Sequence, residues 1–429
     1  MTTAASALPG APFFGYRGGE LHAEEVRVSD LAREYGTPLF VYSQAAMLAA
    51  LAAYQRAFAG RDAQICYAMK ANSSLALLQL FARAGCGFDI VSGGELARVL
   101  AAGGDPAKVI FSGVGKTRAE MRAALAAGIG CFNVESEAEI DVLDAVAREA
   151  GKVAPISIRV NPDVDAKTHP YISTGLKGNK FGIAHERAVA VYRHAASLPG
   201  LRVVGIDCHI GSQITDAAPY LDAVDRVLDL VAAIEAADVP IRHLDFGGGL
   251  GIDYHGDHPP AADVLWARLF ERIDARGYGR RRILIEPGRS LVGNAGLCVT
   301  EVLYLKPGEQ KSFCIVDAAM NDLPRPAMYE AYHAIVPLAP REGAAAATYD
   351  VVGPVCESGD WLGRDRALAV QPGDRLAVLS AGAYCASMAS NYNTRARPAE
   401  VLVDGSRAHL IRARESVEDT FRHEALLPA

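Results

Sequence analysis

The sequence has no long apolar run and no excess of positive charge, and both absences narrow the class of protein. No apolar stretch reaches the roughly 18 residues that a membrane-spanning helix requires. The first residues lack a basic segment followed by an apolar one, so no cleaved signal peptide is predicted. The 43 basic residues are outnumbered by 50 acidic ones, and the net charge of −7 argues against a nucleic-acid-binding protein.

The eight cysteines also lack a metal-binding or redox pattern. No two of them are spaced as C-x-x-C, so neither a zinc ribbon nor a thioredoxin motif is indicated. We expect most of them to be buried as small apolar residues in a reducing compartment. With a hydrophobic fraction of 50%, which suffices to bury a core, the composition predicts a cytoplasmic globular protein without a nucleic-acid or membrane partner.

Short apolar runs alternate with helical patterns over the first two thirds of the chain. Runs of strand length lie near residues 64–69, 86–91, 108–112, 130–135, 154–160, 203–209, 241–246 and 282–286. Helical periodicity separates them at 74–84, 94–102, 117–127, 136–150 and 217–236. This alternation is typical of a parallel sheet covered on both faces, and eight units match a (β/α)8 barrel. A doubly wound open sheet is the main alternative.

The pattern changes after residue 290, where short strands separated by glycine, proline and aspartate replace the long helices. Strands are predicted at 299–306, 311–318, 348–355, 374–380 and 400–405. The run 343–347 is expected to be an exposed loop or a short helix. We therefore predict three parts. They are an N-terminal segment (1–35) that could pair with the β domain, a barrel (36–290), and a C-terminal β-sandwich or β-barrel domain (291–429).

Polar residues gather where the predicted barrel strands end, which is the end at which barrel active sites form. Lys70 follows the first strand, His209 the sixth, and a glycine-rich turn (247–251) the seventh. Glu286 and Arg289 follow the eighth strand. These side chains should therefore meet at one end of the barrel.

Each of these residues also has an ordinary structural interpretation. Lys70 alone would be an exposed lysine at a strand end, and His209 alone a buried core histidine. Tight turns use glycine as often as phosphate sites do, and the run 247–251 lacks the G-x-G-x-x-G spacing of a dinucleotide site. Glu286 and Arg289 could form a surface ion pair worth about 0–1 kcal/mol. Their occurrence together favours the functional interpretation.

A lysine that can form a Schiff base, a phosphate-binding loop and an acid facing a ring nitrogen are the requirements of pyridoxal phosphate. Glu286 would keep the pyridine nitrogen protonated, which makes the ring a strong electron sink. An arginine in its place would weaken that sink and suit a racemase. The residue type therefore favours reactions through a stabilised carbanion, among them decarboxylation.

Eight motifs in this order resemble the fold-type III pyridoxal-phosphate decarboxylases, an alanine-racemase-like barrel family, and within it the diaminopimelate decarboxylases. The resemblance covers nearly the whole chain. The motifs are YAMKAN (67–72), YISTGLKGNKFGI (171–183), HIGSQ (209–213), DFGGGLGI (245–252), EPGRS (286–290), NDLPRPAMYEAYH (321–333), VVGPVCESGD (351–360) and GAYCASMASNYNTR (382–395).

The resemblance implies roles for residues that bind the cofactor, pyridoxal 5′-phosphate. Lys70 would attach the cofactor covalently, with Asp89 and Arg159 supporting it. His209 would stack on the ring, and Glu286 would pair with the pyridine nitrogen. The remaining cofactor contacts would come from Ser212, Gly247, Gly248, Gly249, Pro287, Gly288, Arg289 and Tyr384.

The resemblance also implies a substrate site and a homodimer with shared active sites. The substrate would contact Arg289, Arg325, Tyr329, Glu357 and Tyr384. Cys356 would return a proton to the carbanion, and Cys356 and Glu357 would come from the partner subunit. Without the resemblance, Cys356 would be a buried cysteine and Arg325 a solvated loop arginine. However, the polar sequence around Cys356 favours an exposed thiol, and two flanking prolines stiffen the loop of Arg325.

The implied reaction converts meso-2,6-diaminopimelate to L-lysine and carbon dioxide, the last step of lysine biosynthesis. A decarboxylase acting on ornithine, arginine or carboxynorspermidine is an alternative, although Arg325 favours a substrate with two carboxylates. Glu286 argues against a racemase. The large β domain and the intact Lys70 and Cys356 argue against a non-catalytic pyridoxal-phosphate-binding homologue. A sugar-phosphate barrel enzyme would leave Lys70 and His209 without a shared role.

Overall fold

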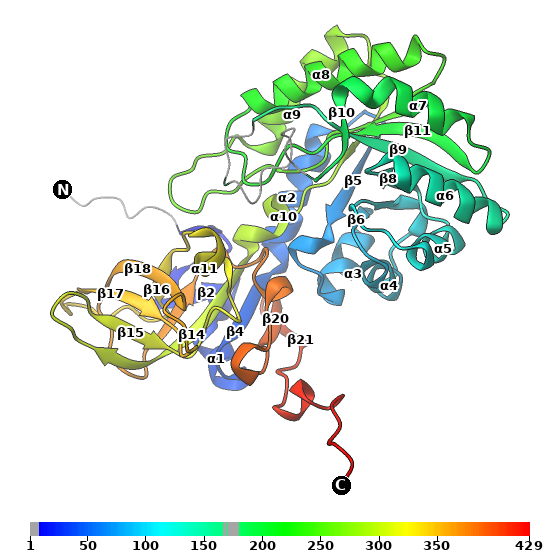
Figure 1. The fold of residues 1–429 in the computed structure, drawn as a ribbon. Coiled ribbons are helices and arrows are strands. Elements are labelled where there is room, and N and C mark those ends of the chain that lie inside the picture. The colour runs from blue at the N-terminus through cyan, green and yellow to red at the C-terminus, as the bar shows by residue number, and fades with distance from the viewer. Residues whose placement is uncertain (1–7, 166–168, 170–179) are drawn as a thin grey trace. The chain divides into compact units, whose positions relative to one another are not determined.

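The computed structural model describes residues 8–165, 169 and 180–429, which fall into two compact units. The barrel unit is formed by the described residues of Leu51–Ile252 and His258–Ser290. The β unit is formed by those of Met1–Ala50, Asp253–Asp257 and Leu291–Ala429 (Figure 1). Each unit is therefore assembled from segments that are separated in the sequence.

Eight parallel strands close into a ring in the barrel unit. They are β5 (Ala63–Ala68), β6 (Gly87–Ile90), β7 (Val109–Phe111), β8 (Cys131–Val134), β9 (Ala154–Asn161), β11 (Leu201–Asp207), β12 (His243–Asp245) and β13 (Arg282–Ile285). The pairings β8–β9 and β13–β5 close the ring, and β10 (Ile183–Ala184) adds to β9. The (β/α)8 barrel is thereby confirmed, and an open doubly wound sheet is excluded.

Helices follow the barrel strands and lie outside them (Figure 1). They are α3 (Leu75–Arg83), α4 (Gly93–Ala101), α5 (Arg118–Ala127), α6 (Glu137–Glu149), α7 (Ala188–Ser197), α8 (Ala218–Glu235) and α9 (Ala262–Ala275), with the short η2 (Pro106–Lys108) and η4 (His185–Arg187) between them. One side of α8 buries Val224, Val227, Leu228 and Val231, a spacing of three and four residues that forms one apolar face. The five helical stretches predicted from the sequence are confirmed.

Two short helical turns at strand ends position candidate site residues. The turn η1 (Met69–Ala71) begins directly after β5 and carries Lys70. The turn α10 (Arg289–Val292) follows β13 and begins with Arg289, and η5 (Gly293–Ala295) comes next. The helix α2 (Gln44–Ala57) precedes the first barrel strand. Tight turns directly after strands keep these side chains at the carboxyl end of the barrel.

The β unit contains a nine-stranded mixed sheet organised around β14 (Gly296–Lys306), which pairs with β4, β15 and β19. The sheet order is β18-β17-β15-β14-β4-β20-β21, with β19 paired to β14 and to β16. The other strands are β4 (Leu39–Ser43), β15 (Phe313–Val316), β16 (Ile335–Pro337), β17 (Ala347–Val352), β18 (Trp361–Leu368), β19 (Arg375–Val378), β20 (Ala399–Asp404) and β21 (Arg407–Arg412).

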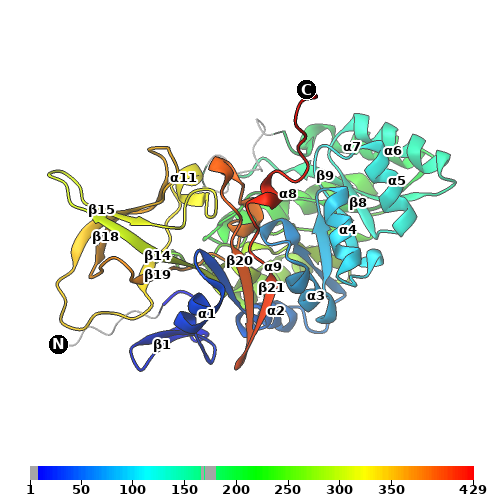
Figure 2. The same ribbon diagram turned by 90° about the horizontal axis from the view of Figure 1, so that it is seen from below.

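A small three-stranded sheet and one helix form the start of the β unit (Figure 2). They are β1 (Phe14–Arg17), β2 (Glu20–Ala23), β3 (Val26–Arg27) and α1 (Val28–Tyr35). Val28 and Leu31 of α1 share one apolar cluster with Leu39 of β4 and Leu297 of β14. The remaining short helices of this unit are α11 (Arg325–Tyr329), η6 (Ala386–Met388), η7 (Tyr392–Thr394) and η8 (Glu418–Thr420).

Strand β4 lies in the sheet of the β unit, although the sequence boundary at residue 35 assigned it to the barrel. It pairs antiparallel with β14 and parallel with β20. All five of its residues are buried. An apolar strand covered on both faces needs a partner on each edge, and β14 and β20 supply these partners. Within its described residues, the N-terminal segment 1–35 itself contributes no strand to this sheet, since β1, β2 and β3 form a separate one.

The sequence missed β16, β18 and β21 in the β unit, whereas its five predicted strands there all exist. Strand β21 is mostly exposed and rich in arginine, and β18 carries three charged residues among its eight, so neither has the apolar run that indicates a strand. The run 343–347 lies in an exposed loop that ends as β17 begins. Among the described residues, no helix combines the length and apolar character that a bilayer crossing requires.

Candidate active site

Lys70 lies at the carboxyl end of β5, where its amine contacts a buried carboxylate. Lys70 Nζ donates to Asp89 Oδ2 on β6 at 2.6 Å. The Asp89 side chain is fully buried, whereas that of Lys70 is 37% exposed. The amine is thus held at the edge of the barrel interior by a strong, charge-assisted contact while it remains accessible. Asp89 therefore lies where the sequence placed it, beside Lys70.

Arg159, on β9, was expected to support Lys70, but its hydrogen bonds are with Glu135 and His209. Its Nη1 donates to Glu135 Oε1 at 3.0 Å, and its Nη2 lies 3.5 Å from the carbonyl oxygen of His209. Glu135 also accepts hydrogen bonds from the N–H groups of Gly113 and Gly182. Both side chains of this ion pair are buried. Glu135 was missed by the sequence analysis, since it follows a strand that carries no other chemical signal.

His209 follows β11 and presents a neutral imidazole to the barrel end. Burial, reinforced by the positive charges of Arg159 and Lys70, holds the pKa of His209 well below its usual range. Its Nδ1 accepts a hydrogen bond from the N–H of Gly248 at 3.2 Å. A Cβ atom at Gly247 would lie 2.7 Å from the same Nδ1, so this loop packs closely onto the ring. The histidine is therefore uncharged and fixed in orientation.

The glycine cradle (Gly247, Gly248 and Gly249) connects β12 to the rest of the site. Gly247 and Gly249 have φ of +63° and +100°, a backbone region that disfavours side chains. A Cβ atom at Gly248 would collide with the carbonyl oxygen of Glu286. The sequence predicted free N–H groups here, but those of Gly247 and Gly248 donate to Asp245 and His209. Of the three, only Gly249 has an N–H without a hydrogen-bond partner in the described part of the chain.

Ser212 and the segment after β13 complete this end of the barrel. Ser212 Oγ accepts a hydrogen bond from Arg289 Nη2 at 3.0 Å. The carbonyl oxygen of Pro287 accepts from the N–H of Ala68, next to Lys70. A Cβ atom at Gly288 would lie 3.1 Å from the carbonyl oxygen of Ala68. The contacts of β5 and β13 therefore bring this predicted phosphate-binding segment against the lysine turn.

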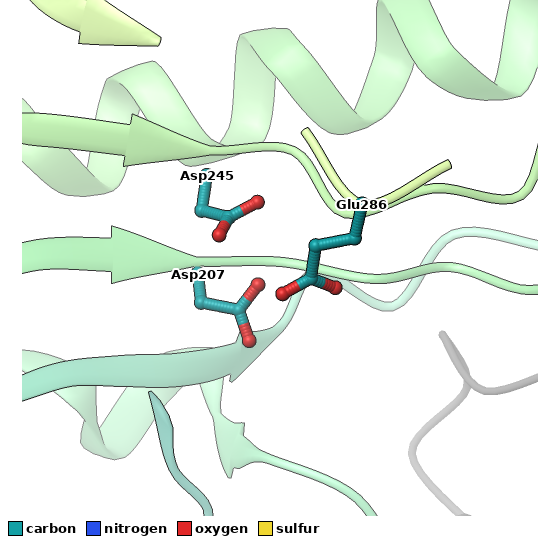
Figure 3. Close-up of side chains that lie close together, drawn as sticks. All are labelled: Asp207, Asp245 and Glu286. Atoms are coloured by element: carbon teal, nitrogen blue, oxygen red, sulfur yellow. The ribbon is translucent and has the colours of Figure 1, made fainter. Parts of the chain in front are cut away.

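Glu286 belongs to a cluster of three buried carboxylates that face one another (Figure 3). One oxygen from each of Asp207, Asp245 and Glu286 lies within 4.8 Å of the others, at the ends of three adjacent strands. Burial, with the charge of Asp89, raises the pKa of Asp245 to about 7. Burial, with the charges of Asp89 and Asp245, also raises the pKa of Glu286 well above its usual range. Three charges this close in a low-dielectric interior repel strongly, so the cluster retains protons.

Asn133, on β8, donates a hydrogen bond to Glu286. Its Nδ2 lies 3.3 Å from Glu286 Oε1 and 3.3 Å from Ser112 Oγ. The Oδ1 of Asp207 and the Oδ2 of Asp245 are buried without a hydrogen-bond partner among the described residues. Asp207, Asp245 and Asn133 were not singled out from the sequence, because nothing in their spacing shows that they meet across the barrel.

In the β unit, Arg325 opens the short helix α11 and is buried. Its Nη1 lies 2.9 Å from Nε2 of His333, and its guanidinium carbon lies 4.8 Å from the centre of the Tyr254 ring. Tyr329 ends the same helix and is half-buried. Arg325 is therefore a packed, positioned side chain and not the solvated loop arginine that its flanking prolines alone would allow.

Cys356 and Glu357 lie in an exposed loop after β17, supported by the loop around η7. The N–H of Cys356 donates to Asn393 Oδ1 at 3.1 Å, and the hydroxyl of Tyr392 donates to Glu357 Oε1 at 2.6 Å. Cys356 is exposed and the other seven cysteines are buried. Tyr384 is half-buried and has a φ of +57°. The exposure predicted for Cys356 is thus observed.

The structure brings twelve of the predicted site residues to the carboxyl end of the barrel. They are Lys70, Asp89, Arg159, His209, Ser212, Gly247, Gly248, Gly249, Glu286, Pro287, Gly288 and Arg289. The other five belong to the β unit, namely Arg325, Tyr329, Cys356, Glu357 and Tyr384. Most of the motif at 171–183 lies outside the described residues.

Comparison with known proteins shows that the chain is similar to pyridoxal-dependent decarboxylases. The pattern of the family described as pyridoxal-dependent decarboxylase, pyridoxal binding domain, matches residues 44–293. The diaminopimelate decarboxylase of Vibrio cholerae is 55% identical over 417 residues, which are 97% of this chain and 99% of the relative.

Solved structures of such enzymes have the same fold. The diaminopimelate decarboxylase of M. jannaschii in complex with L-lysine aligns with a TM-score of 0.93 and 37% identity, covering 98% of this chain and 99% of the other. The enzyme of Helicobacter pylori complexed with L-lysine aligns with a TM-score of 0.88 and 40% identity, covering 92% and 98%. The similarity therefore includes both the barrel unit and the β unit.

Proposed function

The chain belongs to the diaminopimelate decarboxylase family of pyridoxal-dependent decarboxylases, and from this premise we propose that it converts meso-2,6-diaminopimelate to L-lysine and carbon dioxide. This reaction would be the last step of lysine biosynthesis. The observation that carries the proposal is the meeting of Lys70, His209 and Glu286 at one end of the barrel. The substrate assignment is supported by the V. cholerae relative and by the two L-lysine complexes.

The residues at the barrel end fit pyridoxal 5′-phosphate. Asp89 positions the amine of Lys70, and the glycine cradle holds the neutral ring of His209. The buried carboxyl group of Glu286 lies at the end of β13. When it is bound, the cofactor draws electrons away from the α-carbon of the substrate and so weakens the bond to its carboxylate. Ser212, Gly249 and Gly288 would hold its phosphate.

Each barrel residue then has a defined task. Lys70 would hold the cofactor covalently, and Asp89 keeps the lysine amine oriented through the 2.6 Å contact. His209, uncharged and fixed through its Nδ1, would stack on the cofactor ring. Glu286 would hold a proton at the ring nitrogen. Burial and the charges of Asp89 and Asp245 raise the pKa of Glu286, and positive charge at the ring nitrogen would offset this repulsion.

The substrate would be oriented by arginine. Arg289 and Arg325 would bind the carboxylate that is not removed, and this contact would determine which end of the substrate reacts. Tyr329, Glu357 and Tyr384 would contribute further contacts. The guanidinium of Arg325 suits this task because it is buried and permanently charged. A basic substrate with a single carboxylate would leave this positive charge without a partner.

Cys356 would return a proton to the α-carbon after carbon dioxide leaves, and it would do so as part of a homodimer with shared active sites. Its exposure and its backbone contact with Asn393 support an accessible, positioned thiol. Cys356 and Glu357 would reach the active site of the partner subunit. All eight cysteines are free, which supports a cytoplasmic location.

The proposal is tested with the purified protein, pyridoxal phosphate and three parallel substrates. We expect carbon dioxide and L-lysine from meso-diaminopimelate, and no release from L-ornithine or L-arginine. The variant Lys70→Ala should lose both turnover and the yellow absorbance of the protein-bound cofactor. Release from ornithine or arginine alone would overturn the substrate assignment, whereas unchanged absorbance in Lys70→Ala would remove Lys70 from the mechanism.

A further inference from the structure

Arg325 is held in the β unit by two neighbours that carry no negative charge. His333 contacts its Nη1 at 2.9 Å, and the ring of Tyr254 lies beneath the guanidinium, 4.8 Å from ring centre to guanidinium carbon. The rings of Tyr254 and His333 meet edge to face, with centres 5.4 Å apart. Tyr254, Arg325 and His333 are all buried. We call these three residues the arginine cage.

The hydrogen bonds of His333 determine its protonation state. A guanidinium can only donate, so Nε2 of His333 must accept the hydrogen bond from Arg325. A carbonyl oxygen can only accept, so Nδ1 of His333 must donate to the carbonyl of Leu379, 2.8 Å away. The imidazole is therefore neutral, with its proton on Nδ1. Both of its nitrogens are used, which fixes the plane of the ring.

The cage leaves the charge of Arg325 without compensation. In the described part of the chain, the contact with His333 is the only hydrogen bond that the guanidinium makes, and no carboxylate lies within 4.0 Å of it. Arginine does not lose its proton in proteins, and a buried cation without an anion is unfavourable. The remaining donors and the full charge suit a carboxylate that arrives from outside the chain.

The cage is itself supported on the sides away from the guanidinium. The N–H of Tyr254 donates to Asp257 Oδ2 at 2.8 Å, which holds the segment Asp253–Asp257 in a turn. Next to it, the rings of His255 and Tyr332 stack with centres 4.2 Å apart. Arg366 lies 3.9 Å from the ring centre of Tyr332 and donates to the carbonyl of His333. His333 is thus fixed through both its ring and its backbone.

We propose that His333 is a positioning residue that makes the enzyme select a substrate with a second carboxylate, by holding Arg325 through a neutral acceptor. A carboxylate in place of the imidazole would neutralise the guanidinium and compete with the substrate. An apolar side chain would leave the guanidinium free to turn away. A neutral acceptor orients it and leaves its charge available. The inference rests on the proposed function, in which Arg325 binds the carboxylate that is not removed.

The test compares His333→Leu, which removes the acceptor, with His333→Gln, whose amide oxygen can replace Nε2. For His333→Leu we expect the KM for meso-diaminopimelate to rise roughly ten- to a hundredfold, the value of a hydrogen bond to a charged group, with a smaller change in kcat. His333→Gln should recover most of that loss. His409→Leu, at an exposed position on β21, is the matched control and should behave as the wild type.

Inhibition by L-lysine and by 1,5-diaminopentane separates positioning from a general structural effect. L-lysine keeps the carboxylate that Arg325 would bind, so its inhibition constant should rise together with the KM in His333→Leu. 1,5-Diaminopentane has no carboxylate, so its inhibition constant should stay within about twofold. In an Arg325→Lys background, adding His333→Leu should change the KM little further, because the two residues act as one unit. Thermal melting and the bound-cofactor spectrum confirm that the variants fold.

Two results would overturn the proposal. One is an equal loss of affinity for 1,5-diaminopentane and diaminopimelate in His333→Leu, and the other is a full, additive loss in the double variant. If the wild type itself does not decarboxylate diaminopimelate, the proposed function fails first, and the failure is visible before any variant is made. If the wild type is active and His333→Leu keeps its KM, only the role of His333 is lost.

Discussion

Asp245 opens the motif DFGGGLGI, but the motif does not indicate the proton that its side chain retains in the folded protein. Its carboxylate accepts a hydrogen bond from Gly247 through Oδ1 at 2.9 Å, yet its other oxygen is buried without a partner in the described residues. It lies beside Glu286 and Asp207, while the charge of Asp89 raises its pKa further and that of Arg159 lowers it. The protonation of Asp245 therefore depends on all the charged groups at this end of the barrel.

This proton gives the protein without cofactor a predictable pH dependence of stability. The pKa of Asp245 is raised from 3.8 to about 7 in the folded state, mainly by burial. Between these values the folded chain binds a proton that the unfolded chain has lost, so stability falls as the pH rises through about 7. Asp245→Asn keeps the acceptor for Gly247 and removes the titration. We expect a flatter curve, with a gain of no more than about 4 kcal/mol at pH 8.

Urea unfolding of the cofactor-free protein at several pH values measures this difference. Asp263→Asn, on the exposed side of α9, serves as the control and should follow the wild type. Parallel curves for the wild type and Asp245→Asn would show that Asp245 is already ionised at neutral pH in the folded protein.

At this scale the sequence reveals residues that follow a strand and differ from their apolar surroundings. Lys70, His209 and Glu286 could be predicted in this way. Asp207, Glu135 and His333 could not, because their importance lies in which groups meet them after folding. The alternation of strands shows that side chains share a barrel end, but it does not show which carboxylates lie within 4.8 Å of one another.

Among the structural elements, the loop after β12 is the one with the least tolerance for change. Gly248 approaches the backbone of Glu286 so closely that a Cβ atom would collide with its carbonyl oxygen. Gly248→Ala should therefore push the loops after β12 and β13 apart. We expect a loss of stability of about 1–3 kcal/mol and weaker binding of pyridoxal phosphate.

Cofactor titration and chemical denaturation test this prediction together. Gly115→Ala is a suitable control, since a Cβ atom there would have nothing within 4 Å and its φ is not in the left-handed region. Unchanged cofactor affinity in Gly248→Ala would mean that the loop adapts and that its close packing is not required.

Elements could be predicted where burial leaves a clear pattern. All eight barrel strands follow from apolar runs, because both sides of a parallel barrel strand are covered, and α3, α4, α5, α6 and α8 follow from helical periodicity, whereas α7 and α9 were not predicted. Edge strands such as β21 lack this pattern, since half of their surface faces water and their arginines mask the alternation. The position of β4 escaped prediction because its partners lie far away in the sequence.

For the molecule as a whole, the distribution of cysteines gives a simple chemical prediction. Seven of the eight are buried and Cys356 is exposed. The native protein should therefore show one fast-reacting thiol per chain with an aromatic disulfide reagent, and all eight after denaturation. Cys356→Ala should show none in the native state while keeping the spectrum of the bound cofactor. More than one fast thiol in the native wild type would contradict the burial of the others.

The pairing of β4 has a consequence for how the chain acquires its structure during synthesis. β4 leaves the ribosome near the beginning, but its partner strands β14 and β20 begin at Gly296 and Ala399. At about 5–20 residues per second, the second of these partners is made on the order of tens of seconds later. The barrel can close during that interval, while an apolar strand waits unpaired. The strand β4 therefore stays without either of its partners until β14 is made, and without its full pairing until β20 follows.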